Sequence, residues 1–284
     1  VYGIVGLKTH TKTALVVRQE SDGLRSYGHI GTGNYHAETA RLYTDLGLLT
    51  AKPDFTSDLV ELFHYLTGRS LKQDYRKLLV APVNMKHRFL GMIDREIEHQ
   101  RAGRSAQIIA KMNSLEDRRI INRLYQASEA GVQIDLIVRG FCCLKAGVAG
   151  LSENIRVTSV IGRFLEHSRI FYFRHGAEDP ADGEFYLGSA DWMYRNLNSR
   201  VEAITPIEDR PLRERCWNVL QVALDDQRQA WDMQPDGTYR QRRSIDADPG
   251  MGTHQVLMHL ARSRAGLSPP IDERAGHPDR AAAG

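Results

Sequence analysis

The fold is decided by residues 77–140, whose sequence is KLLVAPVNMKHRFLGMIDREIEHQRAGRSAQIIAKMNSLEDRRIINRLYQASEAGVQIDLIVRG. Short apolar stretches at 77–82, 106–111 and 132–140 predict strands, and the segments between them, 86–102 and 116–130, have apolar residues at helical spacing. A strand, a helix and a second strand at this spacing form a βαβ unit. We therefore expect a locally parallel sheet in an α/β fold.

The flanking sequence predicts further elements on both sides. Before the βαβ unit we expect two strands around a turn at residues 20–23, a helix over 36–50 and a helix over 57–68. After it we expect strands at 155–161, 169–173 and 183–190, a helix over 209–232 and a helix over 254–264. These elements divide the chain into a first unit at 1–77, a second at 78–240, and a polar, partly disordered tail at 241–284.

Composition limits the class of protein. The 284 residues are 42% hydrophobic and 26% charged, which is typical of a soluble globular protein and excludes collagen and disulfide scaffolds. A net charge of +3 is too weak to indicate nucleic acid as a partner. Three cysteines without zinc-binding spacing favour a reducing cytoplasm. The chain begins with Val and shows no signal peptide, so we expect a piece of a longer cytoplasmic protein.

An internal repeat carries the most information about function. Counted from a histidine, six residue types recur at offsets of 0, +2, +21, +22, +24 and +35 without a gap. The first copy contains His10, Lys12, Gly31, Thr32, Asn34 and Asp45, and the second contains His167, Arg169, Gly188, Ser189, Asp191 and Glu202. Two copies of one supersecondary unit could pack with both histidines facing one cleft.

The repeated residue types suit phosphoryl transfer. A histidine and a cation two residues apart on a strand point to the same face, so Lys12 or Arg169 can hold a phosphoryl oxygen while the imidazole reacts. The hydroxyls and the Asn34 amide can donate to phosphate. A carboxylate such as Asp45 or Glu202 can fix the tautomer of an imidazole. One histidine can then attack phosphorus while the other protonates the leaving oxygen.

The paired motifs resemble the phospholipase D superfamily, and longer stretches resemble the C-terminal catalytic half of the polyphosphate kinase family. These stretches include GLKTHTK (6–12), HIGTGNYHAETARLYTDLGLLT (29–50), IDLIVRGFCCL (134–144) and GSADWMYRNL (188–197). Phospholipases of the superfamily carry Asp five residues after the motif Lys, where this chain has Val17 and Arg174. That departure favours the kinase family over a phosphodiesterase.

The resemblance implies a fold and an activity. The fold would be α/β, with two phospholipase-D-like units in which helices flank a mixed sheet, the first truncated at its N-terminus. The activity would be ATP:polyphosphate phosphotransferase, the reversible transfer of the terminal phosphate of ATP to inorganic polyphosphate through a phosphohistidine. The resemblance also implies Mg²⁺ as cofactor, ATP, ADP and polyphosphate as partners, and a homo-oligomer. Peripheral membrane association stays open.

The resemblance also implies roles for individual residues. His10 would become phosphohistidine, and His167 would act as general acid and contact the nucleotide phosphates. Tyr43 matches a family tyrosine at the nucleotide, and Arg139 matches an arginine that binds its phosphates. The Mg²⁺ ligands would lie upstream, so no metal ligand is assigned here and we expect little activity from this chain alone.

Independent of the resemblance, Lys111 and Arg139 each follow a predicted parallel strand. Both should therefore lie at the carboxyl edge of the sheet, where α/β proteins bind ligands. Two other functions stay open. One is a phosphodiesterase or phosphatidyltransferase of the phospholipase D superfamily, and the other is a non-catalytic polyphosphate-binding module.

Overall fold

The computed structural model describes residues 3–69, 74–243 and 250–267. Within these residues the strands are β1 (Lys8–Thr9), β2 (Lys12–Glu20), β3 (Gly23–Gly31), β4 (Tyr43–Thr44), β5 (Gly47–Thr50), β6 (Leu79–Ala81), β7 (Gln107–Met112), β8 (Gln133–Val138), β9 (Ile155–Val160), β10 (Leu165–Glu166), β11 (Ile170–Phe173), β12 (Glu184–Gly188), β13 (Arg200–Ile207), β14 (Ala230–Met233) and β15 (Tyr239–Gln241). The α-helices are α1 (Pro53–Leu66), α2 (Met85–Arg101), α3 (Arg118–Glu129), α4 (Tyr194–Asn198), α5 (Arg210–Leu224) and α6 (Thr253–Arg264), and two short 3₁₀ helices span Thr39–Arg41 and Pro180–Asp182. The expected disordered C-terminal residues lie largely outside the described part.

Ten of the described strands form one mixed sheet. Its order is β1-β13-β12-β11-β7-β8-β9-β14-β15, with β6 pairing β13 outside this path. The pair β7–β8 is parallel, as the βαβ pattern predicts, and β8–β9 is parallel as well. The first strand of that pattern, β6, instead pairs antiparallel with β13. The pairs β7–β11, β11–β12 and β12–β13 are also antiparallel. A three-stranded sheet, β2-β3-β5, and the pair β4–β10 lie beside it.

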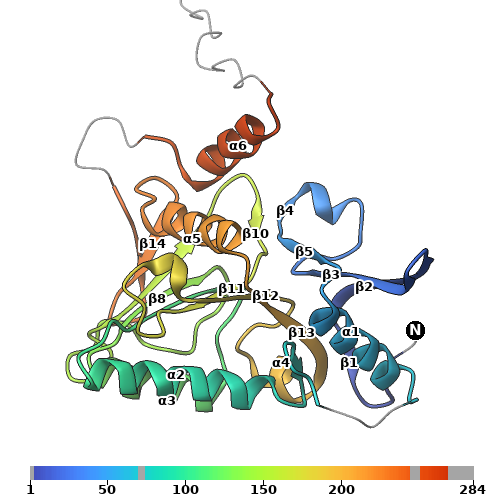
Figure 1. Ribbon diagram of the computed structural model, residues 1–284. Coiled ribbons are helices and arrows are strands. Elements are labelled where there is room, and N and C mark those ends of the chain that lie inside the picture. Colours follow the sequence, from blue (N-terminus) through green and yellow to red (C-terminus); the bar gives the residue numbers. More distant parts are fainter. Residues whose placement is uncertain (1–2, 70–73, 244–249, 268–284) are drawn as a thin grey trace, which may run out of the picture.

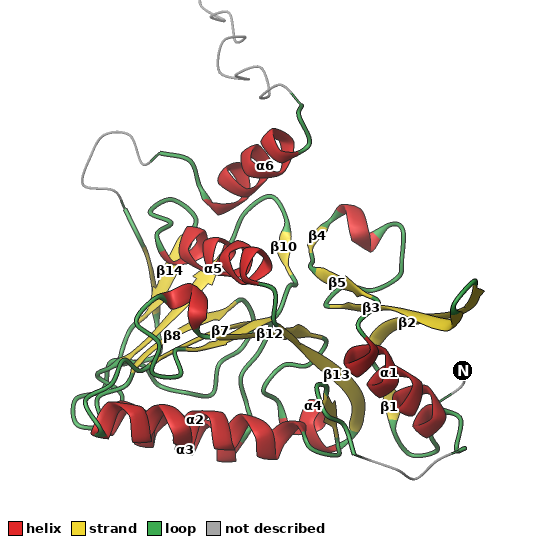
Figure 2. Cartoon of the chain, in the orientation of Figure 1, coloured by secondary structure: helices red, strands yellow, loops and turns green. Residues whose placement is uncertain are grey.

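Helices cover both faces of the large sheet. Helices α2 and α3 lie below it and α5 lies above it (Figure 1, Figure 2). Residues of α2 and α3 such as Phe89 and Leu124 bury the lower face, and Leu220 of α5 buries the upper one. The α/β class with a mixed sheet flanked by helices is thus confirmed. Among the described residues no helix has the length and apolar character needed to cross a membrane.

A third core cluster joins the N-terminal segment to the large sheet. Leu59 and Leu62 of α1 pack with Ile30 of β3 and with Val201 and Ala203 of β13. Strand β1 also extends the large sheet by pairing in parallel with β13. The two predicted units therefore share apolar packing and one sheet.

One predicted helix is wrong, and another ends earlier than predicted. Residues 36–50 contain a short 3₁₀ helix and the strands β4 and β5, because β5 pairs with β3 and its Leu48 packs against the upper core. The helix predicted over 209–232 ends at Leu224, and Ala230–Met233 instead forms β14 at the edge of β9. In both cases strand pairing with distant residues overrides the local pattern.

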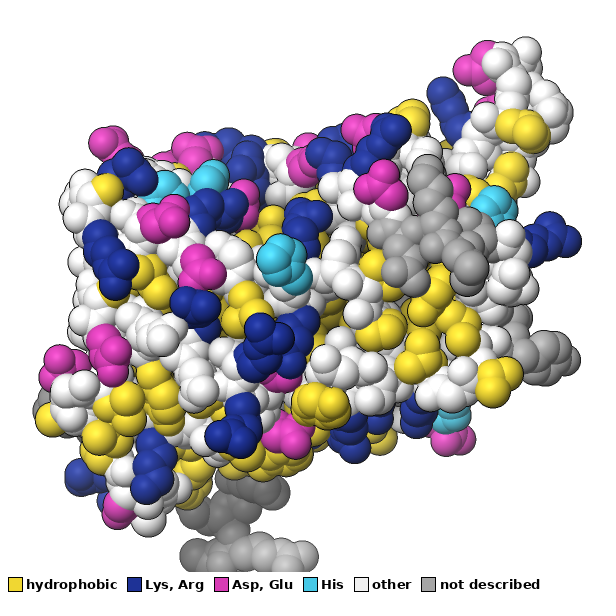
Figure 3. Space-filling view, turned by 90° about the horizontal axis from the view of Figure 1, so that it is seen from below, with side chains coloured by type: hydrophobic (Ala, Val, Ile, Leu, Met, Phe, Trp, Pro, Cys, Tyr) yellow, Lys and Arg dark blue, Asp and Glu magenta, His cyan; other side chains and the backbone are white. Residues whose placement is uncertain are grey.

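Charge is mixed on the surface seen from below. Basic and acidic side chains lie side by side there, interspersed with apolar ones (Figure 3). This agrees with the net charge of +3.

Candidate active site

The sequence repeat forms two similar three-stranded arrangements. In the first, β2 pairs with β3 and β3 with β5, and in the second, β11 pairs with β12 and β12 with β13. His10 and His167 lie just before the first strand of each set, and the glycines Gly31 and Gly188 end the second strand. A Cβ at Gly188 would lie 2.2 Å from the Ala203 carbonyl oxygen, so only glycine fits there.

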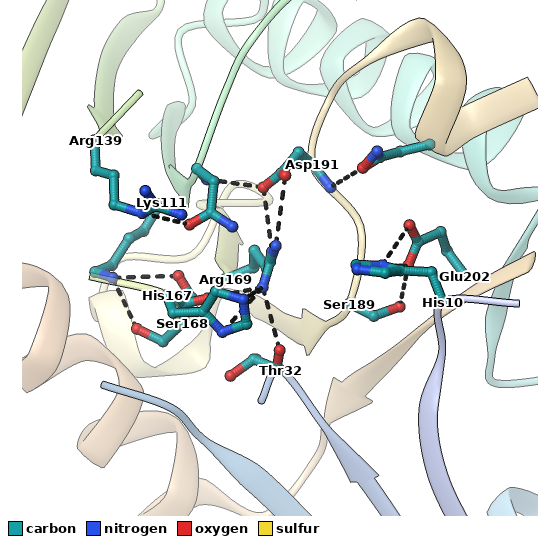
Figure 4. Close-up of polar contacts among 12 residues, drawn as sticks. His10, Thr32, Lys111, Arg139, His167, Ser168, Arg169, Ser189, Asp191 and Glu202 are labelled. Atoms are coloured by element: carbon teal, nitrogen blue, oxygen red, sulfur yellow. Dashed lines mark hydrogen bonds and ion pairs between the residues drawn. The ribbon is translucent and has the colours of Figure 1, made fainter. Parts of the chain in front are cut away.

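His10 is held by a carboxylate from the second repeat. Its Nδ1 lies 2.9 Å from both carboxylate oxygens of Glu202, whose side chain is fully buried in β13. A carboxylate only accepts hydrogen bonds, so Nδ1 carries a proton, and in the neutral ring the lone pair lies on Nε2. Ser189 donates to the same carboxylate at 2.5 Å. In its neutral form His10 therefore presents Nε2 for attack (Figure 4).

His167 is held in the same way by a carboxylate from the first repeat. Its Nδ1 lies 2.7 Å from Asp45 Oδ1, and Thr32 donates its hydroxyl to that oxygen at 3.0 Å. Burial lowers the pKa of His167 below its usual value, although the Asp45 carboxylate acts in the opposite direction. A Cβ at Gly33 would lie 2.5 Å from Asp45, so glycine at this position gives the carboxylate room.

The pairing is thus reciprocal. Each carboxylate at +35 contacts the histidine of the other repeat, His10 with Glu202 and His167 with Asp45. His10 and Glu202 are 192 positions apart in the chain, and His167 and Asp45 are 122 positions apart. Their contacts join the two repeats and place both histidines in one site. The sequence predicted two histidine–carboxylate pairs without indicating which carboxylate each histidine meets.

Two buried cations line the same site. Lys12 Nζ donates to the His10 carbonyl at 2.5 Å, and Arg169 donates to the matching His167 carbonyl at 2.9 Å. Arg169 also reaches across to the Thr32 carbonyl at 3.2 Å (Figure 4). Burial lowers the pKa of Lys12 to about 8, with the charges of Arg169 and Arg200 acting in the same direction. The opposite charge of Glu202 acts against this shift, so the lowered pKa reflects desolvation of the Lys12 cation, and an anionic ligand would stabilise its charged form.

The residues expected at the nucleotide lie next to His167. The Tyr43 ring lies against the His167 ring, with 4.9 Å between their centroids. Arg139 follows β8 and donates its Nε–H to Asn113 and to the Glu166 carbonyl at 2.6 Å. Asn34 is exposed and takes no part in the hydrogen bonds of the two histidines.

Lys111 lies near the carboxyl end of its strand, as expected, but its side chain is not free to meet a ligand. It lies near the end of β7, but its side chain is 3% exposed and its Nζ lies 2.6 Å from Glu166 Oε2. It also donates to the Ser168 hydroxyl at 2.7 Å. Lys111 is thus tied into the segment that carries His167, and its charge already has a protein partner.

Other polar residues also differ from their expected roles. The hydroxyls of Thr32 and Ser189, expected to donate to phosphate, donate to the carboxylates. Asp191 forms an ion pair with Arg169 at 3.1 Å. Sequence reasoning missed Glu166 and His254, whose side chains are 2.7 Å apart. A carboxylate directly before the second histidine was the available signal for Glu166, whereas His254 lies in a region without a motif.

The protein offers no ready-made metal centre in its described part. No group of three or more His, Cys, Asp and Glu side chains there is arranged to hold a metal ion. The carboxylates Asp45 and Glu202 are engaged with histidines. The residues present therefore do not fit a resident Mg²⁺ site.

Comparisons with known proteins agree with the geometry. Residues 1–72 match the family model "Polyphosphate kinase C-terminal domain 1", and residues 78–251 match "Polyphosphate kinase C-terminal domain 2". The chain is similar to the polyphosphate kinases of Synechocystis, at 59% identity over 95% of the chain, and of Streptomyces coelicolor, at 48% over 95%. These matches cover 37% and 36% of the relatives, so the chain spans about a third of their length.

A solved structure is also similar. The crystal structure of polyphosphate kinase from Porphyromonas gingivalis superposes with a TM-score of 0.84 at 37% sequence identity, covering 93% of this chain and 40% of that one.

Proposed function

The chain belongs to the polyphosphate kinase family, and on this premise we propose that it provides the two catalytic histidines for reversible transfer of the terminal phosphate of ATP to polyphosphate. The observation that carries the proposal is the reciprocal pairing of His10 with Glu202 and of His167 with Asp45. It fixes both tautomers and leaves the Nε2 lone pair of His10 without a protein hydrogen-bond donor in the described residues.

The proposed reaction has two steps. His10 Nε2 attacks the γ-phosphorus, an N–P bond forms, and the bond to the bridging oxygen breaks so that ADP leaves with the electron pair. A terminal oxygen of polyphosphate then attacks the same phosphorus, and the N–P electron pair returns to Nε2. Glu202 stabilises the imidazolium character that develops on His10 during the first step.

The remaining site residues serve the phosphates. We propose that the anionic nucleotide raises the lowered pKa of His167, so that its Nε2 takes up a proton and gives it to the departing oxygen while Nδ1–H stays on Asp45. Lys12 and Arg169 would neutralise developing charge, and Tyr43 and Arg139 would contact the nucleotide. Mg²⁺ would arrive on the nucleotide phosphates. Cytoplasmic location, a homo-oligomer and peripheral membrane association stay predictions, as does low activity of this chain alone.

The test uses the full-length protein and ATP labelled in the γ-phosphate. An acid-labile, base-stable label is expected on the wild type. His10→Ala should abolish the label, and His167→Ala should slow turnover more than it weakens nucleotide binding. His87→Ala, at an exposed position of α2, is the matched control and should label normally.

Two outcomes would contradict the proposal. A label that persists in His10→Ala would remove the nucleophile assignment. Cleavage of bis-p-nitrophenyl phosphate without release of ADP from ATP would favour a phosphodiesterase instead.

A further inference from the structure

Directly before His167 lies a buried carboxylate with two partners. The Glu166 side chain is 4% exposed, and its Oε2 lies 2.6 Å from Lys111 Nζ. Its Oε1 lies 2.7 Å from His254 Nε2, and the His254 side chain is 1% exposed. Although burial opposes ionisation, the Lys111 charge and the His254 hydrogen bond lower the pKa of Glu166 to about 2. Glu166 is therefore a carboxylate that needs both partners.

The tautomer of His254 follows from its other contact. Its Nδ1 accepts the backbone N–H of Phe164 at 3.4 Å, so the ring proton is on Nε2 and donates to Glu166. The Phe164 ring also packs edge-on against the imidazole, with 5.5 Å between centroids. The two nitrogens of the His254 ring thus make hydrogen bonds to two residues of one segment, Phe164 at Nδ1 and Glu166 at Nε2.

The segment that His254 holds positions the proposed nucleotide residues. Strand β10 pairs with β4, where Leu165 lies opposite Tyr43 and Glu166 opposite Thr44. Tyr43 of β4 contacts the His167 ring. Asp45, the residue directly after β4, binds His167 Nδ1. The Glu166 carbonyl in turn accepts from Arg139. Movement of β10 would therefore displace several of these groups together.

Helix α6 is anchored by its first turn. Thr253 donates its backbone N–H and its hydroxyl to Asp226 at 2.6 and 2.5 Å, and the His254 N–H donates to Gln229 at 3.3 Å. Residues 253 and 254 are buried, whereas residues 255–264 are exposed or half-buried. The helix thus contributes little to the apolar core, and its main contact with the site is the His254 ring.

We propose that His254 is a positioning residue for phosphoryl transfer, acting through Glu166 on β10 and β4 to hold His167, Tyr43 and Arg139 in place. This inference rests on the proposed function. A helix that follows both predicted catalytic units thereby becomes part of the support of the active site.

The experiment compares three variants of the full-length protein. His254→Phe keeps an aromatic ring and removes both the Nε2–H donor and the Nδ1 acceptor, and His254→Gln supplies an amide donor in place of Nε2–H. His259→Ala, at an exposed position of the same helix, is the matched control. The measurements are kcat and KM for ATP, the rate of histidine labelling, and backbone hydrogen exchange.

Loss of a hydrogen bond to a buried carboxylate predicts a fall of about tenfold in kcat and labelling rate for His254→Phe, with a smaller change in KM. His254→Gln should recover most of the loss, and His259→Ala should behave as wild type. Amides of residues 42–45 and 164–167 should exchange about tenfold faster in His254→Phe, while β7 and β8 should not change.

Several results would overturn the inference. They are a folded His254→Phe with wild-type kcat, equal losses in the Phe and Gln variants, and unchanged exchange at residues 164–167. If His254→Phe does not fold, the Gln variant decides, because normal exchange and turnover are expected only for a retained donor. An inactive wild type would instead overturn the proposed function, whereas the exchange measurement tests the His254 contact separately.

Discussion

The two histidines differ in their access to solvent. The His10 side chain is 22% exposed and that of His167 is 8% exposed. A nucleophile must reach a phosphorus atom on a bulky substrate, which suits the more open His10. Burial lowers the pKa of the more enclosed His167, which favours its neutral form.

Lys12 makes the pH dependence of phosphate binding testable. Burial lowers its pKa to about 8, so the cation is lost as pH rises through that value. We expect kcat/KM for ATP to fall above about pH 8, since it depends on a protonated group of the free enzyme. Lys12→Arg keeps the charge at all these pH values and should move the alkaline limb to higher pH. Arg169, at the matching position of the second repeat, shows that the fold accommodates arginine there. If kcat/KM of Lys12→Arg still falls above about pH 8, a group other than Lys12 is responsible for the decline.

The reciprocal pairing predicts a specific pattern in double variants. Asp45→Asn and Glu202→Gln should each lower kcat by about 10²–10⁴ in the wild-type background. In a His167→Ala background, Asp45→Asn should add little, because its partner is already gone, whereas Glu202→Gln should keep its full effect. The reverse pattern would mean that each carboxylate serves the histidine of its own repeat.

Residue spacing alone predicted much of this site. Three of the six matched offsets identified both histidines, both cations and both carboxylates, and the structure brings these six residues together. The exchange of partners could not be predicted, since it depends on how two distant strand sets pack. The same limit explains why Lys111 was expected to face ligand, although it meets Glu166 from a segment 55 residues later.

Among the elements, α3 begins with a side-chain cap that also joins two helices. Asp117 Oδ1 accepts the N–H groups of Arg119 and Ile120, and Oδ2 lies 2.6 Å from Lys86 Nζ of α2. Asp117→Ala should lower the free energy of unfolding by about 1 kcal/mol for the lost cap. The loss should be larger still, because Lys86 also loses its carboxylate partner. Asp117→Asn keeps the cap and should cost less. Denaturant titration measures both, and equal losses would show that the ion pair dominates.

The element pattern was predicted best where contacts are local. The βαβ region has strongly periodic helices, and its strands agree with the expected ranges within a few residues. The helix predicted over 36–50 is wrong because strand pairing with β3 stabilises Gly47–Thr50 more than a helix would.

On the scale of the whole molecule, the two predicted units are joined by a shared core. Leu78, Val80, Val201 and Ala203 of the second unit are each at most 1% exposed and pack against α1 and β3. Residues 78–240 expressed alone would expose this surface, so we expect them to be poorly soluble and to become soluble on co-expression with residues 1–77. Sedimentation and soluble yield measure this. A soluble 78–240 segment that unfolds at the same denaturant concentration as the whole chain would contradict it.

The exchange of carboxylates between the repeats bears on the ancestry of the protein. A polypeptide with one repeat would have a histidine and a carboxylate that cannot meet, and only a second copy could complete either pair. Such an ancestor would have worked as a symmetric dimer before duplication and fusion joined its halves. After fusion the two halves could differ in sequence, and matching positions do differ: Lys12 corresponds to Arg169, and Asp45 corresponds to Glu202. Natural selection would act on the crossed pairs, so inherited substitutions at position 10 should accompany those at 202, and substitutions at 167 should accompany those at 45.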